Sequence, residues 1–530
     1  MHHPTLSLHA CRLFKKVRLD KARFYFKLYF LLSASLVTAV LLQAQWSNSE
    51  PISLSSGLHP NIVSDGAGGQ IVANYTAASI NMVKLNSAGV GQWTAAIIPI
   101  VYGQLVPVAM TTDGAGGVIV AWTAYDNDYN IYAQRIDANG ETRWSSPRTA
   151  VCTGEGDQLK ASIVSDGQGG AIICWYDHRN GKGVYAQRLN AAGVAQWATD
   201  GVLVTPSTED PENDDDYGPA MVSNGAGEVS IAWTQDVSGR SDIFAQRLNG
   251  SGTRQWPVAG VKLTTSAGTY PFLLNDGSGG NIIVWKGNSV RAQRINTAGI
   301  IQWTAGGKTV STANGRPFAT SDESGGAFIT WISSGVRAQR INDQGSNQWT
   351  QDALLCISTY QPAMPLVITD GAGGCIVSWF DLRSSVNYQV FAQRINGSGT
   401  LIWPTNGASL YPQLMTQLNP VISSNGAQGA VVAWNNSPGP GGATYAQNIN
   451  SNGTPGPLQA APPCHWTGAM NSAWENPANW SGGTIPGSGS DVIINGGTVV
   501  INSNATIRTL TVMPASTLAV SPGHTLKVLH

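Results

Sequence analysis

Two Asp-x-Arg patterns are the residues of this sequence whose types and spacing best suit binding chemistry. They are Asp177 with Arg179 and Asp381 with Arg383, each in a loop that follows an apolar stretch. A carboxylate beside a guanidinium can hydrogen-bond a polar ligand such as a glycan, and it can equally form a salt bridge that shapes its own loop. Both interpretations stay open, and these four side chains are the candidate ligand-binding residues.

An acidic stretch at residues 209–216, EDPENDDD, is the second candidate site. Calcium binds several carboxylate and carbonyl oxygens at once, and Asp210, Glu212, Asp214 and Asp216 alternate in a way that suits this ion. The spacing of an EF-hand is absent, so a solvated acidic loop is the alternative. No cofactor other than Ca²⁺ is expected.

The sequence contains no recognisable constellation for catalysis. The histidines after residue 45 are dispersed, and there is no Gly-x-Ser-x-Gly elbow, no His-Glu-x-x-His helix and no phosphate-binding loop. We therefore assign no catalytic residue. Two acids that converge from distant parts of a chain can cleave a glycan, and linear spacing does not reveal such a pair, so a glycan hydrolase stays as an alternative.

Composition and the N-terminal residues limit the partners. Only 12% of the 530 residues are charged, and 30 Lys and Arg balance 31 Asp and Glu, so no attraction to nucleic acid is expected. Residues 1–44 combine a basic region with an apolar run, which predicts a signal peptide, with an uncleaved membrane anchor as the alternative. No later run is long enough to span a membrane, so a secreted or outer-cell-surface protein is expected.

The candidate residues belong to a repeat that occurs about eight times between residues 59 and 458. Each unit is a variant of one pattern: Asp-Gly-x-Gly-Gly, a small or apolar run ending in Trp, a variable loop, Ala-Gln-Arg, a turn with Gly, and a second Trp. The turn Asp or Asn recurs every 46 to 58 residues, at Asp65, Asp113, Asp166, Asn224, Asp276, Asp322, Asp370 and Asn425. That period suits the four-stranded blades of a β-propeller.

Each unit predicts four short strands. In the third unit they are expected at 161–165, 171–176, 183–190 and 197–204, joined by turns in which Gly accepts the positive φ of a tight hairpin. Of the 18 tryptophans, 15 fall at the end of the second strand or the start of the fourth. Such rings are expected to pack between blades, because burying one removes about 150–250 Å² from water.

The two ends of the repeat indicate a closed ring. Residues 46–58 resemble a fourth strand without its unit, whereas the eighth unit reaches Gly453 without a second Trp. A first strand that completes the last blade explains both departures and covers the sheet edges of an open array. The expectation is an all-β monomer with an eight-bladed β-propeller at residues 45–458.

The repeat resembles that of secreted bacterial propeller proteins. The segment from Asn296 to Trp303, Asn-x-x-Gly-x-x-x-Trp, is similar to the tryptophan-docking motif of eight-bladed quinoprotein-type propellers. The motif of that family has one more residue before its Gly, so the similarity covers the third and fourth strands only. It implies the propeller fold and brings no cofactor residues to this chain.

A Pro-rich linker at 459–463 precedes a different module at 464–530. Residues 464–501 resemble a small β module of large secreted bacterial adhesin-like proteins, with Trp-Thr-Gly, Asn-Pro-x-Asn-Trp and Ile-Pro in place. A period of eight follows, TLTV, TLAV and TLKV, which predicts β-helix-like rungs or the edge of a sandwich. The pattern stops within a period at His530, and truncation of the module is one explanation.

The Arg of Ala-Gln-Arg is expected to be scaffold, because no single site needs six copies. The copies are Arg135, Arg188, Arg247, Arg294, Arg340 and Arg394, with Lys84 and Asn448 in the outer units. The turn aspartates are the expected partners, and a sialidase-type arginine cluster is the alternative. The sequence favours a non-enzymatic secreted or cell-surface protein that binds a glycan or protein through a propeller face. An exported glycan hydrolase and a purely structural repeat are the alternatives.

Overall fold

The computed structural model describes residues 45–76, 79–97, 108–145, 148–179, 182–205, 218–413, 415–436, 442–459, 463–481, 483–488, 490–514 and 516–529. The proposed signal peptide and the acidic stretch at 209–216 lie outside these ranges. Within them, no helix has the length and apolar character needed to cross a membrane.

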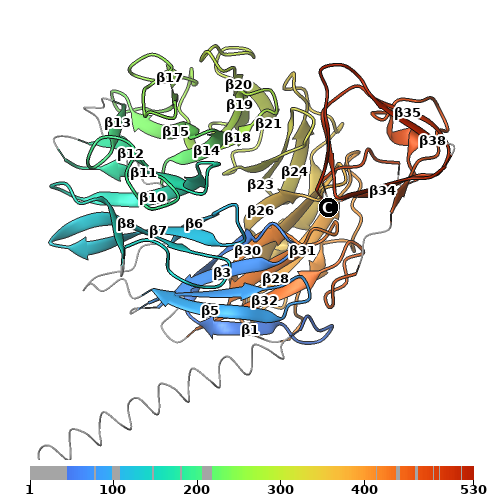
Figure 1. Ribbon diagram of the computed structural model, residues 1–530, viewed down its shortest axis with the longest axis horizontal. Coiled ribbons are helices and arrows are strands. Elements are labelled where there is room, and N and C mark those ends of the chain that lie inside the picture. Colours follow the sequence, from blue (N-terminus) through green and yellow to red (C-terminus); the bar gives the residue numbers. More distant parts are fainter. Residues whose placement is uncertain are drawn as a thin grey trace, which may run out of the picture.

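Eight four-stranded antiparallel sheets form the blades of a ring (Figure 1). In blades one to four, the strands from first to fourth are β2 (Leu58–Ser64), β3 (Gln70–Tyr75), β4 (Ile80–Leu85), β5 (Gly91–Ile97); β6 (Ala109–Thr112), β7 (Val118–Asp126), β8 (Asp128–Ile136), β9 (Thr149–Cys152); β10 (Gln158–Ser165), β11 (Ala171–Asp177), β12 (Gly183–Leu189), β13 (Val202–Thr205); β14 (Ala220–Gly225), β15 (Glu228–Asp236), β16 (Ser241–Leu248) and β17 (Val261–Lys262).

Blades five to eight follow the same order. Their strands are β18 (Thr269–Asn275), β19 (Asn281–Lys286), β20 (Val290–Ile295), β21 (Lys308–Ser311); β22 (Phe318–Ser321), β23 (Ala327–Ile332), β24 (Gly335–Ile341), β25 (Ala353–Ile357); β26 (Ala363–Thr369), β27 (Cys375–Asp381), β28 (Gln389–Ile395), β29 (Ala408–Ser409); β30 (Leu418–Ser424), β31 (Ala430–Asn435), β32 (Ala443–Ile449) and β1 (Ile52–Ser56). A short 3-10 helix, Ser358–Tyr360, follows β25.

The first strands of neighbouring blades contact one another around the whole circle, from β2 with β6 to β30 with β2. Hairpins between first and second strands, and between third and fourth strands, lie at one end of every blade. We call this end the turn face of the ring. The loops between second and third strands lie at the opposite end, the loop face.

The ring closes through the N-terminal strand, as the sequence predicts. β1 pairs antiparallel with β32, and Ile52 lies opposite Ala446. In Figure 1 the two strands lie side by side although one is at the start of the chain and the other follows residue 440. The preceding Trp46 continues the closure, because its indole N–H donates to the carbonyl of Ser87 in the first blade at 3.0 Å. The predicted eight-bladed fold is therefore confirmed.

The turn with Asp-Gly-x-Gly-Gly forms the first hairpin in the expected way in the blades that contain it. In the third blade, Oδ1 of Asp166 accepts hydrogen bonds from the backbone N–H groups of Gln168 and Gly170, both at 2.8 Å. Gly167, between Asp166 and Gln168, has φ 72°, a value that Gly adopts without steric cost. A Cβ on Gly170 would lie 2.1 Å from the carbonyl oxygen of Leu189, so only Gly fits there.

The fourth strand differs from the prediction. In the third blade it is β13, which begins at Val202, whereas the sequence suggests a start at Trp197. Residues 198–201 make a turn, with Gly201 at φ 87°, and the strand resumes after it. Trp197 lies before the turn, where its backbone N–H donates to the side chain of Gln187 at 3.0 Å.

The tryptophans at the ends of the second strands are the centres of the packing between sheets. Each exposes 1% of its surface or less: Trp122, Trp175, Trp233, Trp285, Trp331, Trp379 and Trp434. Apolar side chains of two adjacent blades surround each ring, as Ala121 and Ile173 do around Trp175. The expectation of internal packing is confirmed for this set.

The second set of tryptophans joins each blade to the next. Every indole N–H donates to a backbone carbonyl of the following blade, at 2.8 to 3.2 Å; the donors are Trp46, Trp93, Trp144, Trp197, Trp256, Trp303, Trp349 and Trp403. Each indole also packs on a Gly of the turn whose carbonyl accepts its hydrogen bond. For Gly193 below Trp144, a Cβ would lie 2.6 Å from the indole, so the turn Gly is required for the contact.

The Arg of Ala-Gln-Arg pairs with the turn acid of its own blade, as expected of scaffold. In the third blade, Arg188 contacts Asp166 at 2.9 Å. The equivalent pairs are Lys84 with Asp65, Arg135 with Asp113, Arg294 with Asp276, Arg340 with Asp322 and Arg394 with Asp370. In blade four the turn has Asn224, and the acid is supplied by Glu228, 2.6 Å from Arg247. Blade eight has a neutral pair instead, Asn425 with Asn448 at 2.7 Å.

The C-terminal module is built from parallel strands. β34 (Asp491–Ile494), β35 (Gly497–Ile501) and β36 (Ala505–Ile507) pair with β37 (Thr509–Val512), β38 (Ser516–Val520) and β39 (Leu526–Val528), and β33 (Cys464–His465) also pairs with β34. A 3-10 helix, Pro477–Asn479, lies between β33 and β34. Strands that pair parallel at successive turns of the chain form stacked rungs, and three tryptophans, Trp466, Trp474 and Trp480, fill the space inside.

The five cysteines after the proposed signal peptide, an odd number that predicts no disulfide framework, are free and buried. Burial raises the pKa of Cys152 and of Cys356 to about 12 and raises the pKa of Cys174 further. We expect less than one thiol per chain to react with a thiol-specific disulfide reagent at pH 8, because the thiolate is the reactive form. In denaturant, all five thiols of a chain that begins at residue 45 should react. A fast thiol in the folded protein would contradict the burial.

Candidate functional site

The Asp-x-Arg residues form closed ion pairs within their own loops. Asp177 is fully buried, and its carboxylate accepts hydrogen bonds from Nε and Nη2 of Arg179 at 2.9 and 2.6 Å. The indole N–H of Trp175 donates to the same carboxylate at 2.7 Å. These bonds use both carboxylate oxygens, which leaves little capacity for a ligand.

Arg179 is held on its other side as well. Its Nη2 donates to the carbonyl of Asp200 at 2.6 Å, and its guanidinium lies 4.2 Å from the ring centre of Tyr185. The seventh blade repeats the arrangement, with Arg383 paired with Asp381 at 2.6 Å. In the fifth blade, which has no Asp-x-Arg, Arg291 donates to the equivalent carbonyl of Gly306 at 2.9 Å. A guanidinium therefore binds the carbonyl before the fourth strand in blades three, five and seven, which indicates a structural role within the blade.

The structure does not bring the two pairs together as one site, since each is closed within blade three or blade seven. The four acids proposed as calcium ligands lie in the acidic stretch outside the described residues. Among the residues that are described, no group of three or more His, Cys, Asp and Glu side chains is placed to hold a metal ion.

The C-terminal module contacts the turn face of the ring at blades six to eight. Ser488 Oγ donates to Oε1 of Glu323 at 3.1 Å, and Ser490 Oγ donates to the carbonyl of Gly371 at 3.2 Å. Arg508 donates to the carbonyl of Gly426. The three acceptors belong to the first turns of three successive blades, so the module lies along the turn face and not on the variable loops.

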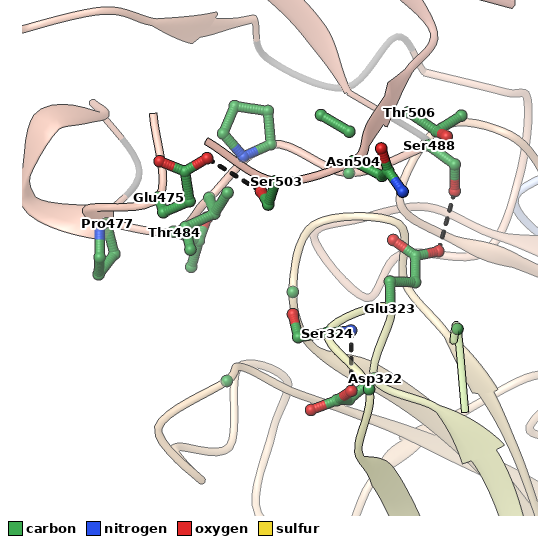
Figure 2. A pocket seen from close by; sticks show the side chains of 18 of the residues that line it. Asp322, Glu323, Ser324, Glu475, Pro477, Thr484, Ser488, Ser503, Asn504 and Thr506 are labelled. Carbon is green, nitrogen blue, oxygen red and sulfur yellow. Dashed lines mark hydrogen bonds between the residues drawn. The ribbon is translucent and has the colours of Figure 1, made fainter. Parts of the chain in front are cut away.

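A cleft of about 1000 Å³ lies between the module and the turns of blades five to seven. Hydroxyl and amide side chains line both walls: Ser278, Ser324, Asn396 and Ser398 from the ring, and Thr484, Ser488, Ser503, Asn504 and Thr506 from the module. Figure 2 shows Glu323 rising from its turn toward Ser488, with Asn504 and Thr506 on the module beside it. The cleft is the candidate functional site.

Glu323 is a departure from the repeat. The second residue of the first turn is Gly in the other seven blades, at Gly66, Gly114, Gly167, Gly225, Gly277, Gly371 and Gly426. All of them have positive φ, and Glu323 has it too, at 60°. A residue with a Cβ pays about 1–2 kcal/mol for this left-handed conformation. The turn itself therefore gains nothing from a glutamate here.

The surroundings of Glu323 change its acidity. Its side chain keeps accessible surface because it faces the cleft, yet the atoms of the turn and of the module crowd around the carboxylate. This burial raises the pKa of Glu323, the nearby Asp370 raises it further, and the hydrogen bond from Ser488 opposes the rise. A carboxyl group with a raised pKa inside a cleft is typical of a functional site.

The charges that line the cleft do not balance. Its acids are Asp276, Asp322, Glu323, Asp343 and Glu475, and its bases are Arg294 and Arg340. Two of the acids form ion pairs with the two bases, Asp276 with Arg294 at 2.7 Å and Asp322 with Arg340 at 2.9 Å. Glu323, Asp343 and Glu475 are left over, so the cleft carries negative charge.

This cleft was not predicted from the sequence, because the candidate residues named there are the Asp-x-Arg pairs, which do not line the cleft, and the acidic stretch outside the described residues. One signal was available: Glu323 is the only non-glycine at its position of the repeat. No linear pattern, however, shows that residues 474–506 lie across from it.

The fold and the cleft define the chain as an eight-bladed β-propeller with a parallel β module docked on its turn face. No protein-family model and no curated protein matches the sequence. Among solved structures, the chain is similar to polysaccharide lyase Uly1, with 9% identity over 75% of this chain and 90% of that chain and a TM-score of 0.41. A putative 6-phosphogluconolactonase from Bacteroides uniformis has 14% identity over 63% and 94%, with a TM-score of 0.38. The lectin SapL1 has 14% identity over 59% and 98%, with a TM-score of 0.32.

Proposed function

We propose that this protein is a secreted or cell-surface binding protein that holds a glycan, without cleaving it, in the cleft between the propeller and the C-terminal module. The observation that carries the proposal is the cleft of about 1000 Å³ with hydroxyl, amide and carboxylate side chains on both walls. A volume of this size is in the range of small-molecule sites, and a few converging polar groups fix the orientation of a ligand.

The polar character of the walls favours a sugar. Each sugar hydroxyl both donates and accepts hydrogen bonds, and so do the hydroxyls of Ser324, Ser503 and Thr506 that face the cleft. The one tryptophan of the lining, Trp474, exposes only 1% of its surface. Recognition would therefore rest on hydrogen bonds and charge, and ring stacking would contribute little.

Binding of the chain from residue 45 to a glycan array tests the proposal, and we expect retention of one class of oligosaccharide. A bulky side chain in the cleft, Ser324→Trp, should abolish that binding. Ala115→Trp is the matched control, because Ala115 has the same place in the turn of blade two, is exposed, and does not line the cleft. Equal binding by both variants, or no glycan bound by the parent chain, would refute the assignment to the cleft.

One observation favours the hydrolase alternative, namely the raised pKa of Glu323. A carboxyl group whose pKa is raised is the type of group that a glycosidase uses as its general acid. Incubation of each retained oligosaccharide with the protein, followed by chromatography of the products, separates the two functions. Cleavage that is lost in Glu323→Gln would establish the hydrolase, and intact oligosaccharide would support the binding protein.

A further inference from the structure

We propose that Glu323 contacts the ligand directly and makes the cleft select an oligosaccharide that carries positive charge, that is, an amino sugar with free ammonium groups. The inference rests on the proposed function, since it names the class of glycan that the same cleft would take. It also assigns to one residue of the repeat a role that its seven counterparts do not have.

The first step is the position of Glu323. Seven blades use Gly at a backbone position with φ between 66° and 81°, and blade six uses Glu at φ 60°. A Cβ at the equivalent Gly114 or Gly277 would find nothing within 4 Å, so there is open space and no packing partner at this place in those blades. The side chain of Glu323 therefore does not serve the hairpin, and it reaches the cleft instead (Figure 2).

The second step is the charge of the cleft. Once the two scaffold pairs are set aside, the charged groups that line it are Glu323, Asp343 and Glu475. Glu475 already accepts hydrogen bonds from the backbone N–H of Asn502 at 2.6 Å and from Ser503 at 2.9 Å. The hydrogen bonds to the Glu323 carboxylate all come from neutral groups, namely the Ser488 hydroxyl at 3.1 Å, the Ser488 backbone and the Thr369 side chain. An ammonium group would compensate this negative charge, whereas a uronate or sulfate would add to it.

The third step is the choice of a sugar over a basic peptide. A lysine side chain needs only a carboxylate, and the cleft offers far more than carboxylates. Nine Ser, Thr and Asn side chains line it, and a polyhydroxylated ring uses both their donors and their acceptors. An amino-sugar oligosaccharide satisfies the hydroxyl groups and the negative charge together.

The experiment measures affinity by calorimetry at pH 6.0 for four probes of similar length: a glucosamine oligomer, the corresponding N-acetylglucosamine oligomer, an oligogalacturonate and oligolysine. We expect the glucosamine oligomer to bind tightest, the N-acetylated oligomer about tenfold or more weakly, and the oligogalacturonate not at all, because a charge-assisted hydrogen bond is worth about 1.5–3 kcal/mol.

Three variants assign the preference to Glu323. Glu323→Gln keeps the shape of the side chain and should reduce the preference for glucosamine over its N-acetyl form by about tenfold. Glu323→Gly restores the residue of the other seven turns, so it keeps the hairpin, and the contacts of Ser490 and Arg508 with the ring still hold the module; it should have the same effect. Glu155→Gln is the matched control, because Glu155 is exposed in the connection between β9 and β10 on the loop face, and it should leave the preference unchanged.

The possible results separate the two proposals. If no oligosaccharide binds, the proposed function itself fails. If the neutral oligomer binds as tightly as the charged one, or if Glu323→Gln keeps the full preference, the glycan site stands and the role of Glu323 is refuted. Tightest binding of oligogalacturonate refutes the charge argument, and binding of oligolysine as tight as that of glucosamine refutes the choice of a sugar.

Discussion

Replacement of Trp331 by alanine is expected to lower the free energy of unfolding by about 3–5 kcal/mol, the usual cost of removing a buried aromatic ring. Trp331 is fully buried in the packing between blades five and six, among side chains such as Val284 and Ile329. The substitution leaves a cavity that two stacked sheets fill poorly. Denaturant unfolding followed by far-UV circular dichroism measures the loss.

Two comparisons identify packing as the cause. The indole N–H of Trp331 has no hydrogen-bond partner among the described residues, so Trp331→Phe keeps most of the ring, loses no such bond and should cost far less than Trp331→Ala. Val386, which exposes 73% of its surface, provides the surface control, since Val386→Ala should change the free energy of unfolding by less than about 0.5 kcal/mol. A loss below about 1 kcal/mol for Trp331→Ala would contradict the conclusion that these tryptophans form the core between the blades.

The propeller could be predicted from the sequence because its contacts repeat. The same residue types recur at the same places from blade to blade, and each indole N–H of the second set of tryptophans donates to a carbonyl in a turn of the following blade. These bonds can form only if neighbouring units stack in one way. The unpaired segment around Trp46 then indicated how the ring closes, and β1 lies where that argument placed it. The start of the fourth strand was placed too early, because the expected strand ran through Asp200-Gly201, a dipeptide that is typical of turns.

The cleft could not be predicted because it depends on a contact between two parts of the chain that share no pattern. Glu323 and Ser488 are 165 residues apart and belong to different modules. Periodicity describes what the blades have in common, whereas a binding site lies where they differ. The Asp-x-Arg pairs also differ from blade to blade, but the fifth blade supplies the same guanidinium from Arg291, so that difference concerns how each blade closes its own loop.

Replacement of Asp177 by alanine is expected to destabilise the protein by about 3–5 kcal/mol, because it leaves the guanidinium of Arg179 and the indole N–H of Trp175 without their acceptor. The carboxylate is fully buried and Arg179 exposes 15% of its side chain, so little water would replace the lost bonds. Removal of both partners, Asp177→Ala with Arg179→Ala, should recover part of the loss, since no buried charge is then left alone.

The same variants test whether this pair binds a ligand. Arg179 and Asp177 close on each other on blade three, away from the cleft beside blades five to seven. A double variant that folds should therefore bind an oligosaccharide with the affinity of the parent chain, as measured by the same calorimetry. Asp381→Ala in blade seven should reproduce the loss of stability, because its carboxylate accepts from Arg383 and Trp379 in the same way. If the folded double variant loses ligand binding while Asp177→Ala costs less than about 1 kcal/mol, the pair is a binding site and not a brace of the loop.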